Sequence, residues 1–351
     1  MSVSDFQIFT SFDNLYASYK TSIKGRRHSA DAIRFDAMAM EALYMMQQQL
    51  RQHNYQIAPY HEFMVSEPKP RSIMSGAFRD KVLQHCLCDY VLLPKLKSVF
   101  VLDNYAGQTG KGTLFGLNRL SAHLSAYHEQ YGENGYILKC DITKFFYSID
   151  HDILKQIVHR HFDDPDIQWI CDLLIDSTPN PGLPLGNQSS QVFALLYLND
   201  MDHLITDELH CSFFGRYMDD LFLLSDSKPY LQDCLHKIKS HLNTLHLSLN
   251  HKTEIVPMQK GIRFLGFHTY LTPDGKVIRR LTGDNKRQAK KRFRKYIKLV
   301  QSGQMTRDNF DERFIAWKNH ISHGNCYRLS HEMDDFVDRL LKEFGLEPSG
   351  Q

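Results

Sequence analysis

Residues 213–224 read FFGRYMDDLFLL, and this stretch decides the fold. Two apolar runs flank the pair Asp219-Asp220, a pattern that predicts a β-hairpin with both carboxylates at its bend. A second apolar stretch, residues 135–141 (GYILKCD), predicts a strand that ends on a third carboxylate, Asp141. Because a strand end and a hairpin bend can meet on adjacent strands of one sheet, the sequence predicts that these aspartates converge.

Clustered carboxylates repel one another unless a divalent cation lies between them. Their oxygens suit Mg²⁺ or Mn²⁺, and two such ions can hold the attacking and leaving oxygens of a phosphoryl displacement. Asp-Asp is also a common turn dipeptide, and Asp141 can instead cap a helix, so the carboxylates alone leave a purely structural role open. The surrounding residues favour the catalytic interpretation.

Outside this region the chain alternates between helical and strand-like patterns. Residues 58–75 predict two short strands joined by a basic turn, and residues 263–270 predict one further strand. Apolar residues at helical spacing predict helices over residues 1–55, 78–100 (interrupted or ended near Pro94), 190–204, 229–248 and 282–344.

Composition and length exclude several classes of protein. The 351 residues, 42% hydrophobic and 23% charged, suit a globular protein of two or three packed units rather than a disordered chain. No apolar run approaches eighteen residues and the N-terminus lacks the order of a secretory signal, so we expect no membrane association. Seven scattered cysteines without C-x-x-C spacing predict buried free thiols and a cytoplasmic location. No H-E-x-x-H motif indicates a histidine metal site.

The charge is unevenly spread along the chain. The total is only +2, but residues 276–298 contain eleven Lys or Arg and one Asp, so the rest of the chain carries −8. An uncompensated basic helix face favours a phosphate backbone over a merely solvated surface, and such contacts position a duplex without reading its sequence. The residues predicted to bind nucleic acid are Arg287, Lys290, Lys291, Arg294, Lys295 and Lys298.

Taken in order, these motifs resemble the catalytic core of reverse transcriptases. The motif at 217–220 (YMDD) follows DITKFF at 141–146, and residues 63–71 resemble the fingers segment of that family. Residues 182–191 (GLPLGNQSSQ) resemble the segment beneath template and incoming base, and residues 264–267 (FLGF) resemble the primer grip. The glycine-rich residues 107–113 lack P-loop spacing and better resemble the family's segment between fingers and palm.

The resemblance implies an α+β, right-hand polymerase with fingers, a palm of antiparallel sheet plus helices, and a helical thumb. It assigns residues 1–55 to an N-terminal helical segment and residues 56–134 to the fingers. The palm would cover residues 135–270, with a fingers insertion at about 155–190, and the thumb residues 271–351. Template RNA, a cDNA or primer strand and dNTPs are the implied partners.

Individual roles follow from the same resemblance. Asp141, Asp219 and the backbone carbonyl of Ile142 would hold two Mg²⁺ ions, for which Mn²⁺ could substitute, with Asp220 as a weaker or outer ligand. Lys252 matches a position proposed to protonate the leaving pyrophosphate, although a surface charge is the alternative. Lys69 and Arg71 would bind the triphosphate, although a solvated turn is the alternative. Phe146 would be a steric gate against the ribose 2′-OH, although a core residue is the alternative. The other residues implied to contact substrate are Leu185, Gly186, Gln191 and Tyr217.

The segment Leu185-Gly186-x-x-x-Ser190-Gln191 is similar to the form found in diversity-generating retroelement reverse transcriptases, although residues 187–189 (NQS) depart from it. That group copies a template-repeat RNA into cDNA mutated at template adenines, with a barrel-shaped accessory variability protein. An aliphatic Leu185, where many relatives carry Gln, cannot hydrogen-bond near the nascent base pair, which implies low fidelity. Alternatives are an anti-phage defence or retron-like enzyme copying a non-coding RNA, and a catalytically silent RNA-binding protein, which the intact aspartates disfavour.

Overall fold

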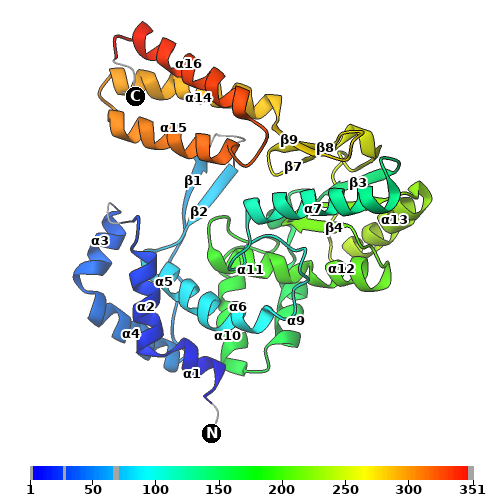
Figure 1. Cartoon of the computed structure of the whole chain (residues 1–351). Coiled ribbons are helices and arrows are strands. Elements are labelled where there is room, and N and C mark those ends of the chain that lie inside the picture. Colours follow the sequence, from blue (N-terminus) through cyan, green and yellow to red (C-terminus); the bar gives the residue numbers. More distant parts are fainter. Residues whose placement is uncertain (1–2, 27–28, 66–70, 347–351) are drawn as a thin grey trace. The chain divides into compact units, whose positions relative to one another are not determined.

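The computed structural model describes residues 3–26, 29–65 and 71–346, so the predicted substrate residue Lys69 lies outside the described residues. Figure 1 follows the chain from its blue N-terminus to its red C-terminus. Two compact units form, and the predicted palm is divided between them, so the predicted subdomain boundaries stay a prediction. Unit 1 comprises Met1–Gly112, Cys140–Leu221 and Gln232–Thr253, and unit 2 comprises Thr113–Lys139, Phe222–Leu231 and Glu254–Gln351.

Unit 1 begins with the helices predicted for residues 1–55. Ser4 caps the first of them: its hydroxyl accepts from the backbone N–H of Gln7, whose side chain accepts from the N–H of Ser4. The fourth helix buries Leu43 and Leu50, which are seven residues apart and therefore share one face. The four helices are α1 (Asp5–Phe9), α2 (Phe12–Ser22), α3 (Ala30–Ala37) and α4 (Ala39–Arg51).

Two strands and a broken helix follow, as predicted. β1 (His61–Val65) and β2 (Arg71–Ser75) pair antiparallel, with Val65 opposite Arg71. Helix α5 (Phe78–Leu87) continues through a π-helical turn, η1 (Cys88–Leu92), into α6 (Leu93–Leu96). Pro94 lies in the first turn of α6, where its missing N–H interrupts least, and the helical segment ends two residues later.

The remaining helices of unit 1 include one that differs from its prediction. The helix predicted over 190–204 breaks at Leu198 (φ −103°, ψ 6°) into two helices. The buried side chain of Arg216 donates to the carbonyl of Leu195, in the last turn before this break. The helices are α8 (Phe145–Ser148), α9 (His151–His161), α10 (Pro165–Ile175), α11 (Gln188–Tyr197), α12 (Asn199–His203), the π-helix η2 (Leu204–Glu208), and α13 (Lys228–Thr244), which begins in unit 2.

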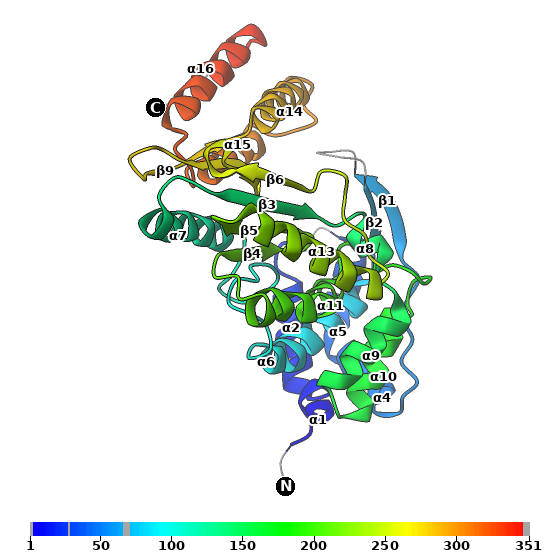
Figure 2. The same ribbon diagram turned by 90° about the vertical axis from the view of Figure 1, so that its right-hand side faces the viewer.

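A four-stranded sheet carries the predicted aspartates. Its order is β4-β5-β3-β6, so β3 and β5 are neighbours, as Figure 2 shows. This confirms the predicted strand at 135–141 and the hairpin at 213–224. The ends of β3 and β5 that carry Asp141 and Asp220 belong to unit 1. The strands are β3 (Tyr136–Asp141), β4 (Phe214–Tyr217), β5 (Asp220–Ser225) and β6 (Glu254–Pro257).

Unit 2 corrects the prediction of one strand over 263–270. Leu265 (φ +49°) and Gly266 (φ +87°) form a tight turn that pairs Phe264 with Phe267, so two strands lie where one was predicted. Two successive left-handed residues suit the twist of a hairpin, and glycine favours the second position. The sheet comprises β7 (Ile262–Phe264), β8 (Phe267–Leu271) and the unpredicted β9 (Val277–Leu281), preceded by the 3₁₀-helix η3 (Met258–Lys260).

Four helices complete unit 2. The last three follow the predicted helical stretch and share a core in which the ring of Phe293 meets those of Phe310, Phe314 and Trp317 edge-on. In the part of the chain that the structure describes, no helix combines the length and hydrophobicity that a membrane crossing requires. All seven cysteines are free and buried, as predicted. The helices are α7 (Thr113–Tyr131), α14 (Gly283–Gln301), α15 (Arg307–Ile321) and α16 (Tyr327–Glu343).

Candidate active site

Backbone hydrogen bonds bring the segments of Asp141 and Asp219 together within unit 1. Asp219 lies in the turn between β4 and β5, and its carbonyl accepts a 3.2 Å hydrogen bond from the N–H of Ile142. On the other side, the N–H of Asn250 donates to the carbonyl of Asp141 at 2.7 Å, and Leu249 bridges to Ile142. The 141–142 segment is therefore held from two sides, independently of any side chain.

The two carboxylates also interact electrostatically. Burial raises the pKa of the Asp219 carboxyl, and the nearby negative charge of Asp141 raises it further. The positive charges of Arg71 and Arg216 lower that pKa, so both arginines lie within electrostatic range of Asp219. Two half-buried carboxylates that repel each other form an environment that favours a bound positive ion between them.

Two carboxylates and a backbone carbonyl form a donor set that fits Mg²⁺. Among the residues described, no three His, Cys, Asp or Glu side chains form a group able to hold a metal. The predicted convergence of all three aspartates and the outer role of Asp220, the first residue of β5, stay predictions. Because Mg²⁺ commonly takes one or two carboxylates and completes its shell with water and phosphate oxygens, Asp141, Asp219 and the carbonyl of Ile142 still suit it.

Arg71 is the predicted phosphate contact that the structure brings to this site. It is exposed at the start of β2 and lies close enough to Asp219 to lower the pKa of that carboxyl. A guanidinium in this place can bind the triphosphate of a nucleotide bidentately.

The predicted gate residue Phe146 lies beside the 182–186 segment. Its ring is half-buried, whereas the neighbouring Phe145 ring is fully buried and meets it edge-on at 5.6 Å. The N–H of Leu183 donates to the carbonyl of Phe146 at 2.7 Å. A Cβ on Gly182 would lie 3.3 Å from the carbonyl oxygen of Tyr147, which leaves glycine the best fit there.

Gly186, the residue after Leu185, lies near the β1–β2 hairpin. Gly186 has φ +111°, and a Cβ there would lie 3.5 Å from Cγ2 of Ile73 in β2. The side-chain amide of the next residue, Asn187, donates to the hydroxyl of Tyr60 just before β1. Gln191 is exposed on α11 and Tyr217, the last residue of β4, is half-buried; their predicted contacts with substrate stay predictions.

Lys252 occupies an exposed turn that is tied to Asp141. Its N–H donates to Oδ1 of Asn250 at 3.1 Å, and Asn250 in turn donates to the Asp141 carbonyl. The turn is therefore positioned relative to the predicted metal ligand Asp141, while the proposed proton transfer by Lys252 stays a prediction.

Sequence reasoning missed one residue of this region, Arg216. Its side chain is fully buried, 0% exposed, and forms an ion pair with Asp202, also 0% exposed. The available signal was a charged residue inside an apolar strand, three residues before Asp219. A charge in such a position requires a buried partner, which only the fold identifies.

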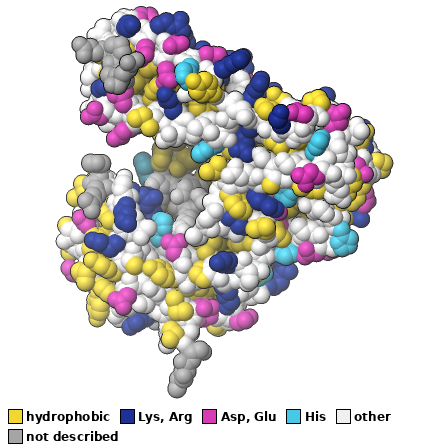
Figure 3. Space-filling view, in the orientation of Figure 1, with side chains coloured by type: hydrophobic (Ala, Val, Ile, Leu, Met, Phe, Trp, Pro, Cys, Tyr) yellow, Lys and Arg dark blue, Asp and Glu magenta, His cyan; other side chains and the backbone are white. Residues whose placement is uncertain are grey.

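In unit 2, α14 presents the predicted basic face. Ala289, Phe293 and Ile297 are buried, and the opposite face is exposed. Figure 3 shows Lys and Arg side chains, in dark blue, on the visible surface over the C-terminal helices. The exposed cations of this face are Arg287 (paired with Asp284), Lys291, Arg294, Lys295 and Lys298, while Lys290 is half-buried and, with Arg294, lies 5.1 Å from the ring of Phe336.

Part of the basic stretch has a structural role instead. Arg279 in β9 is buried and donates to the carbonyls of Leu117 (2.5 Å) and His323 (2.7 Å). Lys286 pairs with Glu332 at 2.5 Å. The charge of +10 therefore overstates the cations free to meet phosphates, because several are already used by the fold.

Comparisons with known proteins agree with this geometry. The family model for reverse transcriptase (RNA-dependent DNA polymerase) matches residues 44–269. Telomerase from Candida albicans, solved in complex with the TWJ fragment of telomeric RNA, is similar in structure with a TM-score of 0.50 and 13% identity, over 83% of this chain and 59% of that one. Apo telomerase from Candida tropicalis, truncated from its C-terminal domain, has a TM-score of 0.49 and 14% identity, over 66% and 58% of the two chains. No curated protein sequence matches.

The chain thus spans about 59% of the length of the Candida albicans protein. At 13% identity, the likeness concerns the fold alone. It confirms the predicted α+β polymerase fold, which combines helices with antiparallel sheets.

Proposed function

Because this chain belongs to the reverse transcriptase family, we propose that it synthesises DNA on an RNA template at the Asp141–Asp219 site. The observation that carries this proposal is the backbone-tied approach of these two aspartates, with Arg71 beside them. Template RNA, a primer or cDNA strand and dNTPs would be its partners.

The residues of the site divide the work. Asp141, Asp219 and the carbonyl of Ile142 would hold the divalent ions, which when bound supply charge stabilisation to the attacking and leaving oxygens. Arg71 binds and orients the triphosphate, and Phe146 excludes the ribose 2′-OH by contact. Lys252 donates a proton toward the leaving pyrophosphate.

A double substitution, Asp219→Ala with Asp220→Ala, tests the polymerase assignment. Incorporation of labelled dNTPs on a primed RNA template should fall by at least about a thousandfold, because a metal clamp contributes several kcal/mol to the transition state. Asp233→Ala is the control, since Asp233 pairs with Lys237 on the surface of α13. Undiminished synthesis by the double variant would refute the metal assignment.

For the biological substrate, we propose the template-repeat RNA of a diversity-generating retroelement, copied into adenine-mutagenised cDNA. Leu185 supports this, since its aliphatic side chain cannot hydrogen-bond at a position adjoining Gly186 and the fingers strand β2. A barrel-shaped accessory variability protein would be a further partner.

Leu185→Gln tests the proposed infidelity. A restored hydrogen bond of about 0.5–1.5 kcal/mol should lower misincorporation opposite template adenine roughly two- to tenfold. Leu185→Met keeps an aliphatic side chain and serves as the control. Equal error rates in all three proteins would contradict the role of Leu185.

Sequencing cDNA made in cells separates the proposed substrate from the alternative. Substitutions clustered at template adenines would support the retroelement. Faithful or repetitive cDNA copied from a non-coding RNA would instead favour an anti-phage defence or retron-like enzyme.

A further inference from the structure

The guanidinium of Arg216 is a fully buried charge of unit 1 with several hydrogen-bond partners. Its Nε donates to Oδ1 of Asp202 at 2.6 Å and its Nη2 to Oδ2 at 2.5 Å, which is a bidentate pair. Both side chains are 0% exposed. Asn104 adds a third donor to the Asp202 carboxylate, at 3.3 Å. Removing two charges from water costs free energy, so a buried pair persists only where its hydrogen bonds offset that desolvation.

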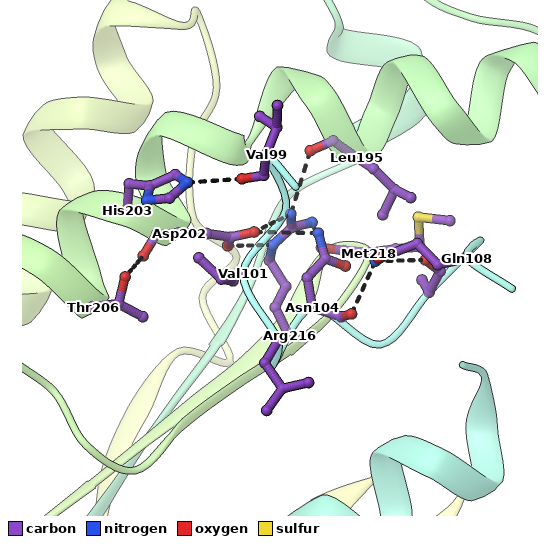
Figure 4. Close-up of polar contacts among 12 residues, drawn as sticks. Val99, Val101, Asn104, Gln108, Leu195, Asp202, His203, Thr206, Arg216 and Met218 are labelled. Atoms are coloured by element: carbon purple, nitrogen blue, oxygen red, sulfur yellow. Dashed lines mark hydrogen bonds and ion pairs between the residues drawn. The ribbon is translucent and has the colours of Figure 1, made fainter. Parts of the chain in front are cut away.

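The remaining donors of Arg216 reach the turn that carries Asp219. Nη1 donates to the carbonyl of Met218 at 3.0 Å, and Nη2 also donates to the carbonyl of Leu195 in α11 at 3.4 Å. Figure 4 shows the guanidinium between the Asp202 carboxylate and these two carbonyls. A charged donor thus holds the peptide group that joins Met218 to Asp219.

That peptide group follows a strained residue. Met218 has φ +55°, the left-handed region that residues with a Cβ avoid at a cost of roughly 1–2 kcal/mol. A residue persists in this conformation only where its surroundings over-determine it. The hydrogen bond from Arg216 to the Met218 carbonyl is a contact that does so.

We propose that Arg216 is a positioning residue, which holds Met218 left-handed and thereby aims the Asp219 carboxylate toward Asp141. The inference rests on the proposed function of Asp219 as a metal ligand. Asp202 acts one step further away: it orients and neutralises the guanidinium from α12 and does not itself face the reacting atoms.

The same network extends to the glycine-rich segment. The N–H and C=O of Arg216 bond to Asp103 and Tyr105, both at 2.9 Å. Lys111 and Gln108 donate to the carbonyl of Asn104, at 2.9 and 3.0 Å. Residues 101–111 are therefore ordered around the same buried pair, and a displacement of Arg216 would reach this segment together with the turn.

An ion pair that only stabilises the fold would explain why Arg216 and Asp202 are buried. It would not explain why Arg216 also donates to the Met218 carbonyl next to Asp219. Buried pairs often contribute little net stability, so a loss of stability on substitution does not identify a positioning role. The distinguishing measurement is divalent-cation affinity, determined by the paramagnetic resonance signal of free Mn²⁺ in protein without nucleic acid or dNTP.

Arg216→Lys is the test variant, because it keeps the positive charge opposite Asp202 but loses the fork that reaches the Met218 carbonyl. We expect Mn²⁺ affinity to fall at least about tenfold, and kcat at saturating dNTP to fall with little change in KM. Wild-type Mn²⁺ affinity in this variant would overturn the proposal.

Arg279→Lys is the matched control. Arg279 is the buried arginine of unit 2 and likewise donates to backbone carbonyls, but it has no contact with the turn at 218–219 among its described hydrogen bonds. It should lose thermal stability while its Mn²⁺ affinity stays within twofold of wild type. An equal loss of affinity in both variants would also overturn the proposal.

Two further variants keep the test decisive. If Arg216→Lys does not fold, Arg216→Gln with Asp202→Asn replaces the pair without leaving a buried charge, and the same loss of Mn²⁺ affinity is expected; unchanged affinity contradicts the positioning role. Met218→Gly is then added to the Arg216 variant, because glycine adopts φ +55° without strain. The Mn²⁺ affinity should recover, and no recovery would contradict the link through Met218.

The outcome is separable from that of the proposed function. If the wild-type protein incorporates no dNTP yet Arg216→Lys weakens Mn²⁺ binding, the polymerase proposal fails and the positioning role stands. If synthesis depends on Asp219 but the Mn²⁺ affinity is the same in wild type and Arg216→Lys, the polymerase proposal stands and the positioning role fails.

Discussion

The two units use positive charge in opposite ways. In unit 1, Arg216 is fully buried, and the hydrogen bonds of its side chain go to one carboxylate and two carbonyls. In unit 2, α14 exposes cations such as Lys291 and Lys295 along one face. A buried charge must be satisfied in one geometry and so fixes the atoms around it, whereas exposed charges can meet a polyanion in many registers. The first arrangement suits a site for chemistry and the second suits a surface that holds a moving duplex.

The largest effect should come from removing the partner of the buried charge. Asp202→Ala leaves Arg216 uncompensated, and we expect it to lower the free energy of unfolding by about 3–5 kcal/mol. Lys295→Ala, on the exposed face, should change it by less than about 0.5 kcal/mol. Urea denaturation of both variants measures the difference. Similar losses of unfolding free energy in the two variants would mean that burial does not distinguish the charge of Arg216 from the exposed charges of α14.

The second effect should appear in binding and not in stability. Lys291→Gln, Lys295→Gln and Lys298→Gln together should weaken binding of an RNA–DNA hybrid and reduce the slope of log affinity against log salt by about 2–3. The melting temperature should stay the same, because all three side chains are exposed.

A matched triple variant controls for net charge. Lys24→Gln, Lys97→Gln and Lys237→Gln remove the same three charges from exposed positions in unit 1. If this variant loses as much of the salt dependence as the α14 variant, then general charge and not the α14 face attracts the nucleic acid.

A third prediction separates shape from charge within unit 1. Phe146→Val should reduce discrimination between dNTP and rNTP roughly 10- to 100-fold, since a contact of this size contributes about 1–3 kcal/mol to selectivity. Tyr147→Val, at the exposed neighbouring ring, is the control. Competitive incorporation measures the ratio, and unchanged selectivity in Phe146→Val would make Phe146 a core residue.

The smallest effect should come from His203, a half-buried group between the buried Arg216 and the exposed cations of α14. Burial lowers the pKa of His203, but hydrogen bonds to the Val99 carbonyl (2.9 Å) and Asp207 (2.7 Å) outweigh it, and the pKa is raised. Stability from protonated His203 is therefore fully present below its ordinary pKa and is lost as pH rises through the raised one. His203→Gln should cost more stability at pH 5.5 than at pH 8.5, and an equal cost at both would contradict this.

Local patterns predicted the elements that depend on local chemistry. Apolar runs around Asp219 and before Asp141 predicted β4, β5 and β3, and helical spacing predicted α14 with its basic face. These signals are strong because each element must bury one side of itself, wherever in the fold it lies.

The errors arose where backbone conformation or a distant partner decided the outcome. The turn at Leu265-Gly266 was hidden in an apolar run, because a two-residue hairpin turn interrupts periodicity very little. The helix over 190–204 breaks at Leu198, beside a carbonyl that accepts from Arg216. Likewise, Arg279 belongs to the basic stretch by sequence, but its contacts with two distant carbonyls give it a structural role.

The sequence by itself determined the inventory of this protein: the strand-borne aspartates, the fold class, the basic helix and the family resemblance. It could do so because residue type and spacing depend on neighbours a few positions away. Only the tertiary structure decided that the segments of Asp141 and Asp219 are hydrogen-bonded to each other, and that the buried Arg216 pairs with Asp202 and donates to the Met218 carbonyl. Those facts join residues far apart in the chain, and the desolvation of a charge is defined only once every neighbour is in place.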